Sequence, residues 1–255
     1  MMQATNTPLG IIFTDNKRLM TFKILVLTLL TSILATTSYA EHGMPSFSAT
    51  YKANVKGLSV EATRELTSLN HGLYQLDFKA TSWAANINES SAFKWQKGKI
   101  KPVRYDYEQK ALGKNRTRQL TFDWNNQAII STEKGKSTVI PNKKLALDRL
   151  SYQLQLQYDL INNTQQLEYQ IADRGKMKQY RFEVIGEEAI DTAVGRLNTV
   201  KIKVVRQNKD RITYLWFAKD WQYLLTRLEQ YENNKKEFQL KLNSAQVESK
   251  AVLGS

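Results

Sequence analysis

The residues that most often carry out catalysis are scarce in this chain. Histidine, the usual general base at neutral pH, occurs only at His42 and His71, and cysteine is absent. His71 lies between an asparagine and a glycine, where a turn explains its presence. Two distant histidines without a thiol argue against a zinc or copper site, and no glycine-rich phosphate loop, nucleophile elbow or EF-hand loop is present. We therefore expect no catalytic residue, no metal and no cofactor.

Paired carboxylates are the catalytic arrangement that the composition leaves open. Glycoside hydrolysis needs only two of them facing each other across a cleft. Neighbouring acids occur at Glu187-Glu188 and at Asp106 and Glu108. Charged side chains at turns and on strand faces are usually solvated. We therefore predict that the protein is not an enzyme, with a carboxylate-based hydrolase as the alternative.

The spacing of basic residues indicates binding instead. In three stretches, every second residue is first a cation and then, further along, an aromatic or aliphatic residue. In a strand, residues two apart share one face, so the cations would lie at one end of an apolar face. These positions are Lys101, Val103, Tyr105 and Tyr107; Lys114, Arg116, Arg118, Leu120, Phe122 and Trp124; and Lys176, Lys178, Tyr180, Phe182 and Val184. Such a face could bury the tail of an amphiphile and pair its anionic head with cations at the rim. The alternative is that the cations flank hairpin turns, with buried stems and solvated heads.

From this pattern we predict a non-enzymatic binder or carrier of a lipid-like or lipopolysaccharide-like amphiphile. The candidate ligand-binding residues are Lys101, Tyr105, Lys114, Arg116, Arg118, Phe122, Trp124, Lys176, Lys178 and Tyr180. The alternative is a structural or interaction protein of the cell envelope with an envelope protein partner, acting through a basic outer face that includes Lys201 and Lys203. The net charge of +13 attracts anionic partners without selecting one, and charge alone predicts no specific nucleic acid.

Strands must position these residues, because apolar residues recur mainly with a period of two. Turn signals such as Asn70-His71-Gly72 separate about thirteen strands between residues 47 and 242. Residues 145–162 instead show apolar spacings of three and four, which predict an amphipathic helix with Asp148 near its start. We expect a mainly β fold: a large curved antiparallel sheet or incomplete β-barrel with that helix packed against it. Residues 41–243 form a single domain, and residues 244–255 are expected to be a disordered tail.

The N-terminal residues are typical of an export signal. Lys17, Arg18 and Lys23 precede a short apolar run that ends in Ser38-Tyr39-Ala40. A cleavable secretory signal peptide has this layout, whereas a transmembrane anchor needs ~20 apolar residues. We predict a signal peptide over residues 1–40, with Met20 as a candidate true start. The mature protein is expected to be periplasmic or secreted and to lack a transmembrane segment.

Four short motifs occur in a fixed order: Phe122-Asp123-Trp124, Leu147-Asp148-Arg149-Leu150-Ser151, Gly195 with Thr199-Val200-Lys201, and Trp216-Phe217-Ala218-Lys219-Asp220. In their order and spacing, over nearly all of residues 46–243, the chain resembles a family of bacterial exported proteins known as domain of unknown function 3108. The resemblance implies an exported, mostly β domain and assigns no activity or catalytic residue. Asp148 and Ser151 match the family's motif at the helix start, and we interpret them as helix-capping residues.

Overall fold

A computed structural model of the chain describes residues 43–55, 58–142, 144–205 and 211–255. These residues belong to one unit, Gly43–Ser255. The predicted signal peptide, residues 1–40, lies outside the described residues. No helix in the described part is long and apolar enough to cross a membrane.

Strands dominate the fold, because turn-forming residues interrupt alternating apolar and polar residues along most of the chain. The first run of strands is β1 (Phe47–Val55), β2 (Leu58–Ser68), β3 (Leu73–Thr81), β4 (Ala85–Gln96), β5 (Lys99–Ala111), β6 (Lys114–Asp123), β7 (Ala128–Glu133) and β8 (Lys136–Pro141). The strand β9 (Ala146–Leu147) and the helix α2 (Ser151–Ile161) follow. The second run is β10 (Glu168–Asp173), β11 (Lys176–Thr192), β12 (Gly195–Val205), β13 (Arg211–Ala218), the 3₁₀ helix η1 (Lys219–Trp221), β14 (Leu224–Glu232), β15 (Lys235–Val247) and β16 (Lys250–Ala251).

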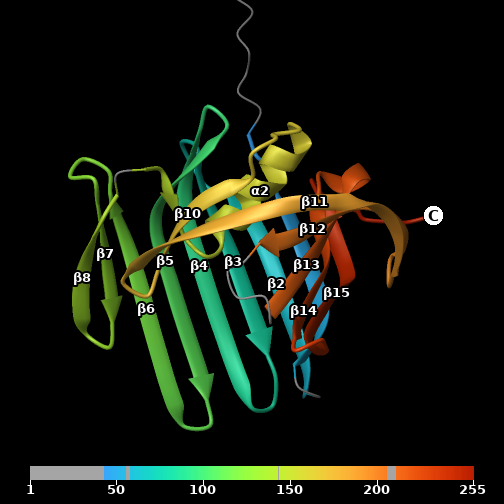
Figure 1. Cartoon of the computed structure of the whole chain (residues 1–255), viewed down its shortest axis with the longest axis horizontal. Coiled ribbons are helices and arrows are strands. Elements are labelled where there is room, and N and C mark those ends of the chain that lie inside the picture. Colours follow the sequence, from blue (N-terminus) through green and yellow to red (C-terminus); the bar gives the residue numbers. More distant parts are fainter. Residues whose placement is uncertain (1–42, 56–57, 143, 206–210) are drawn as a thin grey trace, which may run out of the picture. The chain divides into compact units, whose positions relative to one another are not determined.

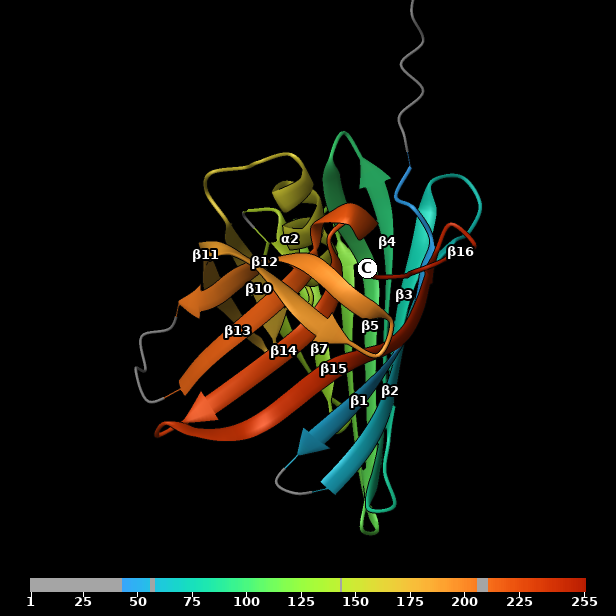
Figure 2. The same cartoon turned by 90° about the vertical axis from the view of Figure 1, so that its right-hand side faces the viewer.

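The strands of the described part form one open sheet of sixteen strands. Each run is an antiparallel meander, and the two runs join where β1 pairs with β15. β8 and β9 are the edges, so the sheet does not close. Figures 1 and 2 show the second run crossing over one face of the first, with β10 and β11 in front in Figure 1. The prediction of a mainly β fold with a large curved sheet and one helix is confirmed.

The crossing of the two runs creates an interior between their inner faces. The tip of the β10–β11 hairpin reaches β7, where the Gly175 amide donates a hydrogen bond to Ser131 Oγ at 3.1 Å. The helix α2 lies at one end of this interior (Figure 1), where Gln155 Oε1 accepts a hydrogen bond from the Ile100 amide of β5 at 2.9 Å. Buried apolar side chains from both runs form one core. The interior therefore has two walls, one from each run.

The helix is shorter than the sequence predicts, because Asp148 fixes its start. α2 spans Ser151–Ile161 rather than residues 145–162. The Asp148 carboxylate accepts hydrogen bonds from the amides of Leu150 at 2.8 Å and Ser151 at 2.9 Å, and the Asp148 amide donates to Ser151 Oγ at 2.8 Å. These reciprocal bonds have the pattern of a capping box, which starts the helix after the extended β9. Asp148 and Ser151 therefore cap the helix.

The C-terminal residues are ordered, so the expectation of a disordered tail over residues 244–255 is wrong. β15 continues to Val247, which pairs with Phe47 of β1, and β16 pairs with the end of β15. Only 1% of Val252 is exposed, and the Gly254 amide donates to Val194 O at 2.7 Å. These partners come from distant parts of the chain, and a local sequence pattern does not reveal them.

Candidate functional site

Residues that pair across neighbouring strands share a face of the sheet, so each set of paired residues forms a row across β12–β15. Successive rows on the inner face differ in polarity. One row is apolar and contains Ile202, Leu215, Leu228 and Leu240. The next row contains Val204, Thr213, Gln230 and Phe238. Beyond it, at the start of β13, Arg211 pairs with Glu232, and Arg211 Nη2 lies 3.2 Å from Glu232 Oε1. The face therefore changes from apolar through polar to charged.

Cations face these rows from β11, from the turn between β10 and β11, and from the segment just before the helix. Lys178 Nζ of β11 lies 2.5 Å from Asp173 Oδ2 of β10, and Arg174 Nε in the turn between them lies 4.0 Å from Asp173 Oδ1. Arg149, just before α2, has its Nε 3.9 Å from Glu89 Oε2 of β4. Burial opposes the charge of Arg149, but Glu89 and Asp173 outweigh it and hold the pKa of Arg149 above its ordinary value. Arg149 therefore stays charged beside the interior.

A pocket of about 420 Å³ lies between these two walls. Its apolar lining is Val204, Leu215, Leu228 and Phe238; its cations are Arg149, Arg174, Lys178 and Arg211; its carboxylate is Asp173; and Tyr152, Gln153, Tyr180, Thr213 and Gln230 complete it. The volume lies within the range of small-molecule sites, ~300–1,000 Å³. The lining holds four cations and one carboxylate, and two further carboxylates outside the lining, Glu89 and Glu232, pair with Arg149 and Arg211.

Thr213 contributes a buried hydroxyl to the pocket lining, between the apolar row and Arg211. Only 5% of the residue is exposed, and Oγ1 has no hydrogen-bond partner within the described ranges. A buried hydroxyl that lacks a partner costs about 1–3 kcal/mol. An oxygen atom of a ligand in the pocket would supply that partner.

The first run of strands contributes a second polar layer next to the pocket. Glu89 Oε2 accepts a hydrogen bond from the Tyr105 hydroxyl at 2.5 Å, and Arg118 Nε of β6 lies 2.9 Å from Glu133 Oε1 of β7. The Arg118 guanidinium also lies 4.7 Å from the centre of the Tyr107 ring. Burial and the charge of Glu89 raise the pKa of Tyr105, so its hydroxyl stays protonated and donates. This layer holds its charges in pairs.

The structure brings part of the predicted site together. Lys178 and Tyr180 line the pocket. Tyr105 and Arg118 belong to the adjoining polar layer, and Phe122 is buried in the core with 6% exposed. These residues lie on the inner face, as their alternation predicts.

The other predicted cations are spread over the fold. Lys114 and Arg116 are exposed on β6 near the β5–β6 turn, and Lys176 is exposed at the start of β11. Lys114 pairs with Ala111 at the end of β5, whereas Lys101 lies near its beginning. At ~3.3 Å per residue, roughly 30 Å of strand separates those two positions. One anionic head group cannot contact both, so the predicted cations do not form a single rim.

Lys101 also lies on the opposite face from the one its spacing predicts. The pairing of β4 with β5 shifts register at Val103, which is 36% exposed. This extra residue is a β-bulge and reverses the alternation, so that Tyr105 points inward while Lys101 points outward. Lys101 Nζ lies 5.1 Å from the centre of the Trp124 ring. The predicted grouping of Lys101 with Tyr105 on one face is wrong.

Sequence reasoning does not identify three important pocket residues, Arg149, Arg211 and Thr213. Arg211, Thr213 and Leu215 are every second residue of β13 and therefore share one face. The same pattern, a cation followed by apolar residues on one face, is the one from which the binding residues on β6 and β11 are predicted. Arg149 carries no such signal, since it lies in a turn before the helix. Its position in the pocket lining depends on tertiary contacts such as the one with Glu89 of β4.

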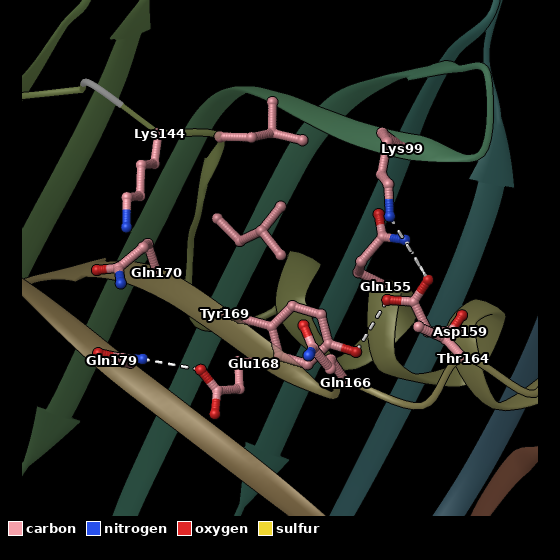
Figure 3. Close-up of a pocket in the computed structure, with 12 residues that line it drawn as sticks. Lys99, Lys144, Gln155, Asp159, Thr164, Gln166, Glu168, Tyr169, Gln170 and Gln179 are labelled. Carbon is pink, nitrogen blue, oxygen red and sulfur yellow. Dashed lines mark hydrogen bonds and ion pairs between the residues drawn. The ribbon is translucent and has the colours of Figure 1, made fainter.

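A second pocket, of about 340 Å³, lies beside α2, β9 and β10 (Figure 3). Its buried carboxylate, Asp159, accepts hydrogen bonds from the Tyr169 hydroxyl at 2.9 Å and from Gln155 Nε2 at 3.1 Å. Lys99 Nζ lies 3.7 Å from the same carboxylate. These bonds connect the helix with β5 and β10 and satisfy both carboxylate oxygens. We assign this cluster a structural role.

The neighbouring acids considered for glycoside hydrolysis also have partners. Arg104 Nε and Nη2 donate to the Asp106 carboxylate at 2.6 and 2.9 Å. Glu188 Oε1 accepts a hydrogen bond from Trp216 Nε1 at 2.6 Å. In the part of the chain that the structure describes, no cluster of histidine and acidic residues could hold a metal ion.

Comparisons with known proteins identify a family and a fold. A family model described as Protein of unknown function (DUF3108) matches residues 46–241. No curated protein is significantly similar to the chain. A crystal structure of a β-barrel-like protein of DUF1849 from Brucella abortus is similar with a TM-score of 0.53 and 8% identity, covering 81% of this chain and 99% of that one. A structure with a YmcC-like fold from Bacteroides fragilis has a TM-score of 0.31 and 10% identity, covering 80% and 97%. The likeness to the Brucella protein concerns the fold alone.

Proposed function

The chain belongs to the family of proteins of unknown function DUF3108, and from this premise we propose that it is an exported, non-enzymatic protein that binds or carries an anionic amphiphile. The family supplies no activity, so the proposal depends on the pocket between the two runs of strands. Its cations and its apolar lining suit the two ends of such a molecule.

The order of side chains along the pocket carries the proposal. Arg211, Thr213 and Leu215 are alternate residues of β13 and share the inner face, about 7 Å apart. A charged group, a hydroxyl and an apolar side chain therefore follow one another into the fold. An amphiphile with an anionic head, a polar neck and a hydrocarbon tail has the same order. Lys178 and Arg174 add positive charge from the facing wall.

The N-terminal sequence supports the exported location. Its basic residues, short apolar run and small residues at Ser38 and Ala40 are those of a secretory signal peptide. Anionic lipids and lipopolysaccharides are abundant in the bacterial envelope that such a signal leads to. The proposed ligand and the proposed compartment therefore agree.

Native mass spectrometry of the protein purified from the periplasm, with organic extraction of co-purified molecules, tests the proposal directly. We expect a stoichiometric anionic amphiphile. Protein that carries none and also fails to bind added dodecanoate would overturn the proposal. The alternative of an interaction protein would then lead, although Lys201 Nζ is engaged within the fold, 3.3 Å from Glu188 Oε1 and 4.9 Å from the centre of the Trp216 ring.

A matched pair of variants tests the orientation of the ligand. Arg211→Met removes a cation at the pocket mouth, while Arg181→Met removes a cation from the outer face of β11, where 54% of the Arg181 side chain is exposed. Calorimetric titration with dodecanoate should show about tenfold weaker binding to Arg211→Met. Arg181→Met should bind as the wild type does.

Dodecanol is the matched ligand control, since it has the same tail without the charge. We expect it to bind the wild type more weakly than dodecanoate and to be insensitive to Arg211→Met. Equal effects of the two substitutions on dodecanoate, or equal affinities for the acid and the alcohol, would contradict a cationic mouth.

A further inference from the structure

Arg64 is a buried cation outside the pocket. It lies on β2 between Ala62 and Leu66 in an alternating buried series, and only 4% of the residue is exposed. The Phe47 ring centre lies 5.8 Å from the Arg64 guanidinium. The Tyr51 hydroxyl accepts a side-chain hydrogen bond from Arg64 and donates one to Leu225 O at 2.9 Å. The side chain therefore points into the interior rather than into solvent.

One edge of the Arg64 guanidinium has no partner among the described residues. Both Nε and Nη2 are buried and make no hydrogen bond there. These two atoms form the side-on fork that grips a planar carboxylate or two phosphate oxygens. Burying a guanidinium with unpaired donors is costly, so such an arrangement needs an explanation.

The row of side chains that includes Arg64 shows which charge lacks a counterpart. Consecutive cross-strand partners on the inner face of β2–β7 are Arg64, Phe78, Glu89, Tyr107, Arg118 and Glu133. Glu133 pairs with Arg118, and Glu89 lies beside Arg149. Among the described residues of this row, Arg64 is thus the cation that no carboxylate faces.

The same chain shows what this edge binds when an acid is present. Arg104 on β5 uses its Nε and Nη2 to hold both oxygens of the Asp106 carboxylate, at 2.6 and 2.9 Å. Arg104 is largely in solvent, with 55% of its side chain exposed. Arg64 presents the identical edge inside the fold, where a low dielectric strengthens a charge-assisted hydrogen bond.

We infer that Arg64 is an anion-binding residue whose Nε–Nη2 edge receives a carboxylate or phosphate group of a small molecule held inside the fold. Arg64 lies four residues along β2 from Val60, which belongs to the continuation of the pocket's apolar row through Ala53 and Leu240. Those four residues correspond to roughly 13 Å of strand. Arg64 therefore lies at a different level of the sheet from Leu215 and Thr213 of the pocket, and the inference does not depend on the proposed function.

Thermal unfolding of the full-length protein tests this inference. The probes are sodium acetate, sodium phosphate and dodecanoate, each against sodium chloride at equal ionic strength. We expect the wild type to gain about 5 °C in Tm with a saturating oxyanion that fits the fork. Stabilisation by acetate or phosphate would identify a free small anion, and stabilisation by dodecanoate alone would identify the head group of a larger molecule.

Arg64→Met should separate binding from folding. Without oxyanions we expect its Tm to rise by about 5 °C, since methionine fills similar space without an unpaired charge. The stabilisation by oxyanions should disappear. Arg104→Met loses the same charge from the surface and should keep the full oxyanion response.

Arg64→Lys provides a second readout, because lysine keeps the charge but lacks the planar fork. We expect it to lose more than half of the oxyanion-dependent shift in Tm. If Arg64→Met lowers the Tm and both variants respond to oxyanions as the wild type does, the guanidinium serves packing against Phe47 and the inference is wrong. A wild type that no oxyanion stabilises beyond chloride would overturn it as well.

Discussion

Asp148→Ala removes a carboxylate on which both the helix start and a strand depend. Asp148 is fully buried, with 0% exposed. One carboxylate oxygen caps the helix through the amides of Leu150 and Ser151, and the other accepts a hydrogen bond from Ser91 Oγ of β4 at 2.7 Å. The substitution therefore leaves two backbone donors and one buried hydroxyl without their acceptor.

The expected loss of stability follows from these contacts. Losing the cap costs about 1 kcal/mol, within a range of about 0.5–2. Leaving the Ser91 hydroxyl unpaired in the interior adds about 1–3 kcal/mol. Relief from burying a carboxylate offsets part of this, so we expect a net loss of about 2–4 kcal/mol. For a domain of this size each kcal/mol lowers the Tm by about 2–4 °C.

Asp148→Asn isolates the charge from the acceptor, because the amide oxygen can still cap the helix. Burial raises the pKa of Asp148 above its ordinary value of 3.8. The stability that this group contributes is therefore complete below that value and is lost as the pH rises through the raised pKa. Asp148→Asn should lack this dependence. Its stability relative to the wild type should improve as the pH increases from about 4 to 7.

Urea unfolding followed by tryptophan fluorescence and circular dichroism measures these differences. Asp123→Ala is the matched control, since the exposed Asp123 carboxylate accepts the Asn126 amide at 3.0 Å in a surface turn. We expect it to cost much less than Asp148→Ala does. A loss below 1 kcal/mol for Asp148→Ala, or equal losses for the alanine and asparagine variants, would refute the reasoning.

Three further predictions concern the pocket, a turn and acid stability. Thr213→Val should raise the free energy of unfolding by about 1 kcal/mol, because it removes an unpaired buried hydroxyl, and should weaken dodecanoate binding in the same titration. Gly98→Ala and Gly113→Ala share the strain of φ near +74° and +75°, but only a Cβ at Gly98 would meet Tyr158, whose Oη lies 2.9 Å away. Urea unfolding should therefore show a loss about 1–3 kcal/mol larger for Gly98→Ala. Burial opposes the charge of Glu229, but hydrogen bonds from its neighbours outweigh burial and lower its pKa below 4.5. The stability it contributes is present above 4.5 and lost as the pH falls, so Glu229→Gln should flatten the acid side of the stability profile.

Each of these predictions has a contrary result. Thr213→Val that destabilises the fold would mean that the hydroxyl has a partner in solution. Equal losses for Gly98→Ala and Gly113→Ala would mean that Tyr158 moves aside without cost. An unchanged acid limb in Glu229→Gln would assign the loss of stability at low pH to other carboxylates.

The fold could be predicted because local signals agree with it. Alternating residues mark most strands, as the burial pattern of β2 between Val60 and Leu66 shows. Turn residues such as Gly72, with a φ of +71°, mark the hairpins. An antiparallel meander pairs neighbours in sequence, so the order of strands within each run follows from the sequence itself.

Features that depend on distant partners could not be predicted. The bulge at Val103 reverses the face of Lys101, and no local pattern distinguishes it from a regular strand residue. The pairing of Phe47 with Val247 joins the two ends of the domain and orders a segment that lacks its own periodicity. Only the docking of the segment before α2 onto β4 places Arg149 beside Glu89, which is 60 residues earlier in the sequence.

Arg64 and Thr213 differ in a physical way from Asp148, Asp159 and Arg118, which also lie in the interior. Asp148, Asp159 and Arg118 have partners that satisfy their charges. Arg64 and Thr213 have buried atoms without a partner in the described part of the chain, and each lies at an inward position of its strand. A sequence could remove both costs with an apolar residue of similar size, and stability alone would favour that change. If a molecule bound inside the fold uses this guanidinium and this hydroxyl, the two substitutions that should raise stability are also the ones that should reduce binding.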